Sequence, residues 1–191
     1  MRIVAGTLRG RKLGSPVEGV RPTSDRVRES LFSRLGDLSG ESVLDLFAGT
    51  GALGIEALSR GAESLVSVDH SRKAIAAMEQ TFEQFGLASE ARTLHLTALA
   101  AIRRLSGEGQ LFSLVFLDPP YAEGSALEEA LVALRDSGLL APGAILVVET
   151  PRRNPLAWPI PGFGLEEARR YGDTVISWIY ALTESENEEE Q

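Results

Sequence analysis

The chain has 191 residues, of which 43% are hydrophobic and 24% charged, and its net charge is −8. This length suits one domain with a proper core plus an appendage, and excludes two large domains. The absence of cysteine excludes disulfides and thiolate metal sites, and two histidines far apart do not suggest zinc, so we expect no metal.

No apolar run approaches the ~18 residues of a membrane span, and no apolar segment follows the N-terminal arginines as in a secretory signal. We therefore expect a cytoplasmic protein without a membrane partner, and a monomer. Charge is unevenly placed, because residues 1–34 hold eight Lys and Arg against three acids, whereas residues 184–191 hold five acids and no base. The acidic tail, 184–191, is expected to be disordered.

The basic N-terminal extension, residues 1–22, is expected to form a small β-hairpin, with short strands at 2–5 and 7–13 around Gly6. Arginine and lysine interleaved with glycine suit a segment that follows phosphates, although a solvated charged arm remains possible. The candidate phosphate-binding side chains for a nucleic-acid partner are Arg9, Arg11, Lys12 and Arg21.

Thr23 or Ser24 is expected to cap a helix that ends near Gly36. Strands and helices then alternate: we expect strands at 42–47, 64–69, 92–96, 112–118 and 144–149, and helices at 52–60, 71–85, 98–106 and 125–136. Two further strands, 165–171 and 174–182, flank the turn signal Gly172-Asp173. The sequence therefore predicts an α/β, Rossmann-like fold with a mostly parallel seven-stranded sheet and a C-terminal antiparallel hairpin.

A glycine-rich turn, Phe47-Ala48-Gly49-Thr50-Gly51, follows the first of these strands. Gly49 and Gly51 let the backbone approach a ligand closely, and Gly54 permits tight packing of helix on sheet. Asp69 ends the next strand 18 residues after Gly51, where an acceptor for ribose hydroxyls belongs. Asp45 would disfavour a pyrophosphate but favour a ligand with an ammonium group, such as S-adenosylmethionine.

The second motif is Asp118-Pro119-Pro120-Tyr121, which closes the apolar run 114–117. Two prolines remove two N–H donors, so unpaired carbonyls, a carboxylate and an aromatic ring stand together. This arrangement suits a planar group with an exocyclic amine, such as a nucleobase. A simple strand-ending turn is an equally good interpretation of these four residues alone.

With both motifs in this order, the chain resembles a class I methyltransferase that acts on exocyclic amines. The N-terminal part of the chain makes the resemblance more specific. It resembles the RsmD family of bacterial 16S ribosomal RNA guanine-N2 methyltransferases at residues 2–6, 9–13 and 21–29. The resemblance covers residues 2 to about 182 and implies a methyltransferase domain over 23–183. The implied partner is 16S rRNA, in the small ribosomal subunit or its assembly intermediates.

The resemblance also assigns the cofactor S-adenosylmethionine to particular residues. It places the methionine end at Asp45 and the turn from Phe47 to Gly51, and the ribose at Asp69. Adenine is implied to lie against His70 or Ser71 and the Thr97-Ala98 segment. Many relatives have an aspartate near position 97 or 98 to accept the adenine amine, and this chain has none, so that contact is open.

For the catalytic step, the resemblance and the chemistry point to Asp118, Pro119 and Tyr121. Asp118 and the Pro119 carbonyl would each accept one N–H of the target amine, and Tyr121 would stack on the base. An adenine-N6 DNA methyltransferase would use the same motif, and a catalytically silent RNA-binding module is a further alternative. An NAD-dependent oxidoreductase would explain the glycine-rich turn but neither Asp45 nor the Asp-Pro-Pro-Tyr motif.

Overall fold

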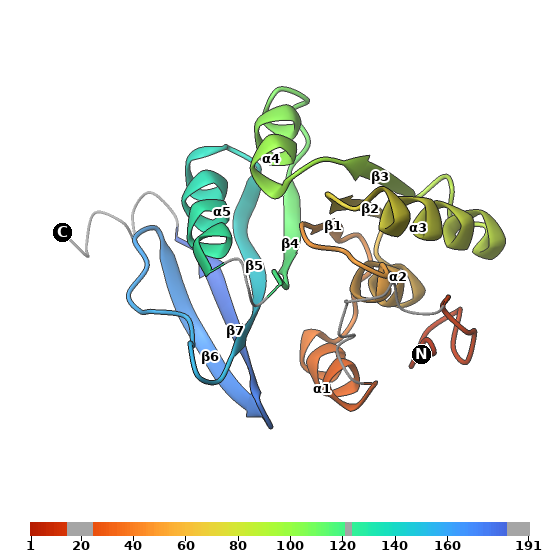
Figure 1. Ribbon diagram of the computed structural model, residues 1–191, viewed down its shortest axis with the longest axis horizontal. Helices are drawn as coiled ribbons and strands as arrows, with labels where there is room; N and C mark the ends of the chain where they lie inside the picture. Colours follow the sequence, from red (N-terminus) through yellow and green to blue (C-terminus); the bar gives the residue numbers. More distant parts are fainter. Residues whose placement is uncertain (15–24, 121–123, 183–191) are drawn as a thin grey trace. The chain divides into compact units, whose positions relative to one another are not determined.

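The computed structural model describes residues 1–14, 25–120 and 124–182 (Figure 1). The chain divides into two compact units, Met1–Ala98 and Leu99–Gln191. The predicted helix cap at Thr23 or Ser24, and the acidic tail from Glu184, lie outside the described residues. Within these ranges, no helix is both long enough and apolar enough to cross a membrane.

The first unit contains a parallel three-stranded part of the sheet in the order β3-β2-β1. Asp45 is level with Ser67, and Asp69 is level with His95, so the carboxyl ends of these strands lie at one edge. The elements of this unit are α1 (Asp25–Leu35), β1 (Ser42–Asp45), α2 (Ala52–Ser59), β2 (Ser64–Asp69), α3 (Arg72–Phe85) and β3 (Ala91–His95).

The second unit contains four strands in the order β4-β5-β7-β6, of which β4 and β5 are parallel and β7 is antiparallel to both of its neighbours. Its elements are α4 (Ala98–Ser106), β4 (Phe112–Leu117), α5 (Gly124–Asp136), β5 (Leu140–Pro151), β6 (Phe163–Tyr171) and β7 (Thr174–Ala181). The α/β class, the mostly parallel seven strands and the C-terminal hairpin are confirmed.

Helix α2 is buried over its whole length because one face packs on the sheet and other residues are covered by the N-terminal segment. A Cβ added to Gly54 would lie 2.7 Å from both Leu65 methyl carbons, closer than real Cβ contacts. Glycine is therefore required where α2 approaches β2, as expected from the sequence. In the other unit, Trp178 is 1% exposed and belongs to the core.

The largest differences from the sequence-based expectation concern strand β5 and the N-terminal segment; β1 ends two residues earlier than expected and β6 begins two residues earlier. Strand β5 begins at Leu140, four residues before the predicted start at 144, because Leu140 pairs with Phe112 ahead of a register shift. In the N-terminal segment, the two expected strands are reduced to a single antiparallel bridge between Arg2 and Lys12.

Candidate functional site

The glycine-rich turn after β1 is held by backbone hydrogen bonds at the carboxyl edge of the first unit. The Ala48 N–H donates to the Val68 carbonyl at 3.0 Å, and the Gly51 N–H donates to the Ala48 carbonyl at 2.7 Å. Gly49 and Gly51 have φ of 53° and 74°, in the left-handed region. The turn thus needs glycine for its conformation, and it places the first residues of α2 behind it.

Asp69 fixes this turn from the neighbouring strand. One of its carboxylate oxygens accepts the Gly49 N–H at 2.8 Å, and the other accepts the Ser71 N–H at 2.7 Å. Ser71 in turn caps α3, where its hydroxyl accepts the Ala74 N–H at 3.3 Å. The side chain expected to bind ribose therefore also ties the turn to the start of α3.

Asp45 is a buried carboxylate, 1% exposed, and neither of its oxygens has a hydrogen-bond partner among the described residues. Burial raises its pKa to about 7, and the negative charge of Asp69 acts in the same direction. The backbone N–H groups of Gly54 and Phe47 oppose this shift, but neither forms a hydrogen bond of normal geometry with the carboxylate. An orphaned carboxylate beside a ligand turn is suited to a positively charged group.

The residues predicted to border adenine follow β2 and β3 at the same edge of the first unit. The His70 side chain is 60% exposed, and the His70 backbone carbonyl lies 3.0 Å from His95 Nε2. Thr97 is exposed and Ala98 is buried. The residues that follow β3 thus provide no carboxylate for the adenine amine, as the sequence indicated.

In the second unit, the Asp118-Pro119-Pro120 turn directly follows the buried strand β4. Asp118 is half-buried, Pro119 is buried and Pro120 is exposed, while Tyr121 lies outside the described residues. Glu149 lies near the end of the parallel strand β5, where it accepts a hydrogen bond from the Thr174 hydroxyl at 3.4 Å.

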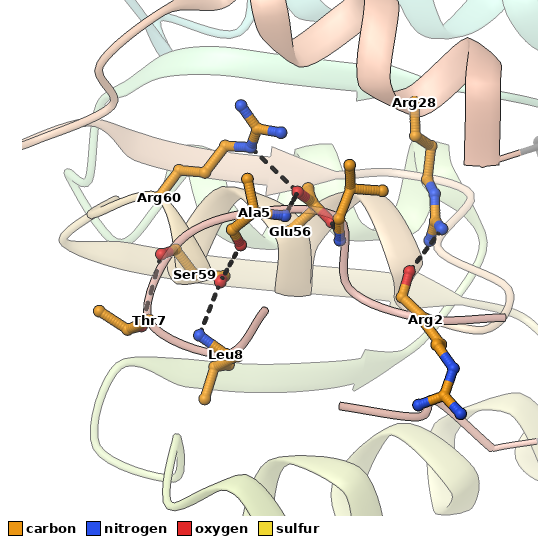
Figure 2. Close-up of polar contacts among 9 residues, drawn as sticks. Arg2, Ala5, Thr7, Leu8, Arg28, Glu56, Ser59 and Arg60 are labelled. Atoms are coloured by element: carbon orange, nitrogen blue, oxygen red, sulfur yellow. Dashed lines mark hydrogen bonds and ion pairs between the residues drawn. The ribbon is translucent and has the colours of Figure 1, made fainter. Parts of the chain in front are cut away.

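The N-terminal segment, residues 1–13, is docked on α2 by two polar side chains, Glu56 and Ser59 (Figure 2). The buried Glu56 carboxylate accepts the N–H groups of Val4 and Ala5 at 2.8 and 3.0 Å. It also pairs with Arg60 Nε at 3.0 Å. These three donors compensate a charge that would otherwise be costly to bury.

Ser59 completes the docking through both its hydroxyl and its carbonyl. The hydroxyl donates to the Ala5 carbonyl at 2.6 Å and accepts the Leu8 N–H at 3.0 Å. The Ser59 carbonyl accepts the Thr7 N–H at 2.7 Å. This role was not predicted from the sequence, although a glutamate and a serine on an otherwise apolar helix were the available signal.

Arg28 also supports the segment rather than a ligand. Arg28, on α1, is 0% exposed, and its guanidinium donates to the Arg2 carbonyl at 2.7 Å. The candidate RNA-binding residues Arg9, Arg11 and Lys12 are exposed, and the Arg11 guanidinium lies 4.4 Å from the Phe85 ring centroid. Arg21 lies outside the described residues.

Gly6→Ala is expected to detach the N-terminal segment, because an added Cβ would lie 1.7 Å from the Ser59 carbonyl oxygen. Gly10→Ala is the matched control, since both glycines have φ of 81° but Gly10 has nothing within 4 Å. Gly10→Ala should lower the free energy of unfolding by about 1–2 kcal/mol, because alanine is strained in the left-handed conformation. Amide hydrogen exchange at Thr7 and Leu8 should rise in Gly6→Ala only; equal exchange in both variants would contradict the close approach.

The alternating strands and helices, the glycine-rich turn and the antiparallel β7 define the Rossmann-like fold of class I methyltransferases. The chain belongs to the family described as Conserved hypothetical protein 95, whose model matches residues 1–180. This confirms the resemblance to the RsmD family, because related sequences carry the name Ribosomal RNA small subunit methyltransferase D.

Two such relatives come from Escherichia coli strain K12 and Haemophilus influenzae. The first is 40% identical over 160 residues, covering 82% of this chain and 77% of the relative. The second is 38% identical over 164 residues, covering 83% of each. A solved structure of yhhF from Escherichia coli is similar over 95% of this chain and 97% of its own, with a TM-score of 0.83 and 32% identity.

Proposed function

We propose that the protein transfers a methyl group from S-adenosylmethionine to the exocyclic N2 amine of a guanine in 16S rRNA. The observation that carries the proposal is the Asp118-Pro119-Pro120 turn at the carboxyl end of β4, in a chain related to small-subunit rRNA methyltransferases over most of its length. Its substrate would be the small ribosomal subunit or an assembly intermediate.

The first unit has the groups that S-adenosylmethionine requires. The buried, orphaned Asp45 carboxylate matches an ammonium group, and the turn from Phe47 to Gly51 offers backbone for close approach. Asp69 has lone pairs left for ribose hydroxyls beyond the two N–H groups that it accepts. When bound, the cofactor supplies an electrophilic methyl group on a sulfonium.

The second unit would prepare the nucleophile. The guanine N2 lone pair is delocalised into the ring, so the site must localise it. Asp118 and the Pro119 carbonyl would each accept one N–H, which favours tetrahedral nitrogen and directs its lone pair at the methyl. As the nitrogen–carbon bond forms and the carbon–sulfur bond breaks, the positive charge that develops on nitrogen lies beside the Asp118 carboxylate. One N–H proton then leaves through Asp118 or water.

The reaction can be tested by incubating the protein with tritiated cofactor and small ribosomal subunits and identifying the labelled nucleoside. N2-methylguanosine in 16S rRNA is the expected product. N6-methyladenosine, or labelling of DNA alone, would instead support an adenine methyltransferase. No labelling together with micromolar binding of NAD would overturn the proposal.

Asp69→Ala is expected to weaken cofactor binding by about 1–3 kcal/mol, the range for a hydrogen bond to a charged group. Because Asp69 also accepts the Gly49 and Ser71 N–H groups, the variant should loosen the turn. Calorimetry with S-adenosylmethionine measures the affinity, and Asp37→Ala is a control, since Asp37 is exposed and its carboxylate accepts hydrogen bonds from nearby Ser39. Unchanged affinity in Asp69→Ala would remove Asp69 from the site.

The N-terminal segment is proposed to follow phosphates beside the target nucleotide. Changing Arg9, Arg11 and Lys12 to glutamine should lower the slope of log affinity against log salt by roughly 0.7–0.9 for each lost phosphate contact. Cofactor affinity should not change, and deleting Glu184 to Gln191 should leave methylation intact. An unchanged slope would make the segment a solvated surface only.

A further inference from the structure

We infer that the start of the segment between β5 and β6, at Arg152 and Arg153, forms with Arg170 a second RNA-binding surface at the edge of the sheet where the Asp118-Pro119-Pro120 turn begins, and that Trp158 extends it along the segment; this inference rests on the proposed function. It is carried by three observations within the second unit: where the segment leaves the sheet, which of its side chains are exposed, and how its arginines are paired.

The segment leaves the sheet at the edge where the Asp118-Pro119-Pro120 turn begins. β4 and β5 are parallel neighbours (Figure 1). Leu117 is level with Val148, so Asp118 and Pro151, the last residue of β5, lie toward the same edge of the sheet. Pro151 is level with Thr174 on β7, and Thr174 with Tyr171 on β6. The Arg152 N–H donates to the Asp173 carbonyl at 2.8 Å, which ties the segment to the turn between β6 and β7.

The segment exposes the side-chain types that bind RNA. Arg152 and Arg153 are exposed, and Trp158 is 39% exposed, whereas the other tryptophan of the chain, Trp178, is 1% exposed. A large exposed aromatic ring is a stacking surface for an unpaired base, and arginine binds phosphate in a forked geometry. Prolines 155, 159 and 161 restrict the backbone between them, which lowers the entropy lost on binding.

The arginines at this edge are available for a partner. Glu149, three residues before Arg152, accepts a hydrogen bond from the Thr174 hydroxyl. Within the described ranges, Arg152, Arg153 and Arg170 form no ion pair, whereas Arg169 pairs with Glu167 and lies over the Trp178 ring. Residues 152–162 contain no acid, and Asp173 is the exposed carboxylate in the adjoining turn. The excess of positive charge at this edge favours a polyanion such as RNA over an uncharged, apolar protein surface as the partner.

The first test compares Arg152→Gln/Arg153→Gln with Arg103→Gln/Arg104→Gln. The control removes the same charge from exposed residues of α4, which leads to the opposite, amino end of β4. With an unmodified 16S rRNA transcript as probe, the first variant should lower the slope of log affinity against log salt by about 1.4–1.8, for two phosphate contacts, and the control should not. Equal slopes in the two variants would overturn the inference.

The second test uses the fluorescence of the two tryptophans. The transcript should quench Trp158 in the wild type, and Trp158→Phe should lose this quenching, because Trp178 is buried. Trp158→Ala should weaken RNA binding roughly tenfold, within the range for one stacked base. Quenching that persists in Trp158→Phe would contradict stacking at this position.

The outcomes also separate this inference from the proposed function. If the wild type methylates rRNA and both sets of variants bind the transcript as the wild type does, only the second surface is wrong. If the Arg152/Arg153 and Trp158 variants weaken binding to reconstituted small subunits but not to the free transcript, the surface contacts a ribosomal protein. The inference that it binds RNA would then be wrong. If the wild type neither binds nor methylates rRNA, the proposed function itself is wrong.

Discussion

Replacing Asp118 with alanine is expected to reduce methyl transfer by about 10²–10³-fold, the usual cost of removing one preorganised group that stabilises charge in a transition state. The loss should appear in kcat, because Asp118 acts on the amine as the new bond forms. Single-turnover transfer from tritiated cofactor to small ribosomal subunits measures it. Cofactor affinity should stay within a few-fold of wild type, since Asp118 is assigned to the base and not to the cofactor.

Asp136→Ala is the matched control for Asp118→Ala. It is the same change in the same unit, but Asp136 is exposed and pairs with its neighbour Arg135, so turnover should not change. Near wild-type turnover in Asp118→Ala would reduce the Asp-Pro-Pro turn to a structural strand ending. A parallel fall in cofactor affinity would move Asp118 to the cofactor instead.

Asp45→Asn is expected to stabilise the ligand-free protein at pH 8 while weakening its affinity for S-adenosylmethionine. The Asp45 pKa is about 7 in the folded chain, against an ordinary value of 3.8. Below 3.8 the carboxyl is protonated in both states and carries no penalty. As pH rises toward 7 the unfolded chain ionises first, so stability falls, and above 7 the loss is complete, on the order of a few kcal/mol.

Denaturant unfolding of wild type and Asp45→Asn between pH 5 and 8 measures this effect. The two curves should diverge as pH rises, with the variant the more stable, and added S-adenosylmethionine should restore stability to the wild type more than to the variant. Parallel pH profiles would show that the buried carboxylate is compensated within the protein. The expected divergence would instead show that Asp45 is retained for cofactor binding at the expense of the stability of the ligand-free protein.

The fold was predictable wherever local signals agreed. The limits of β2 and α4 matched the structure because clear apolar periodicity coincided with turn residues at both ends. The requirement for glycine at position 54 was also predictable, since a helix that follows a glycine-rich turn packs closely on its sheet. The start of β5 was missed because Pro142-Gly143 resembles a turn, and only pairing with β4 across the sheet extends the strand to Leu140.

The missed contacts share one physical cause, which is that their partners are backbone groups far away in the sequence. Glu56 and Ser59 bind N–H and carbonyl groups 51–54 residues earlier in the chain, and such groups are present at every position of any sequence. Arg28 is a similar case, since it bonds to the carbonyl of Arg2. Side-chain patterns predict the edge of the sheet where ligands bind, but not which backbone segment a buried polar group will hold.

The separation between the N-terminal segment and its anchors in α2 affects the order of events during biosynthesis. Residues 1–8 leave the ribosome before Glu56 and Ser59 are made, and at about 5–20 residues per second this interval is roughly 3–10 s. During it, the Val4 and Ala5 amides and the apolar Ile3 and Leu8 side chains, all later protected, face water. This segment is synthesised before β1 and α2 and must therefore await both before it can fold, and in that interval it is open to proteases and chaperones.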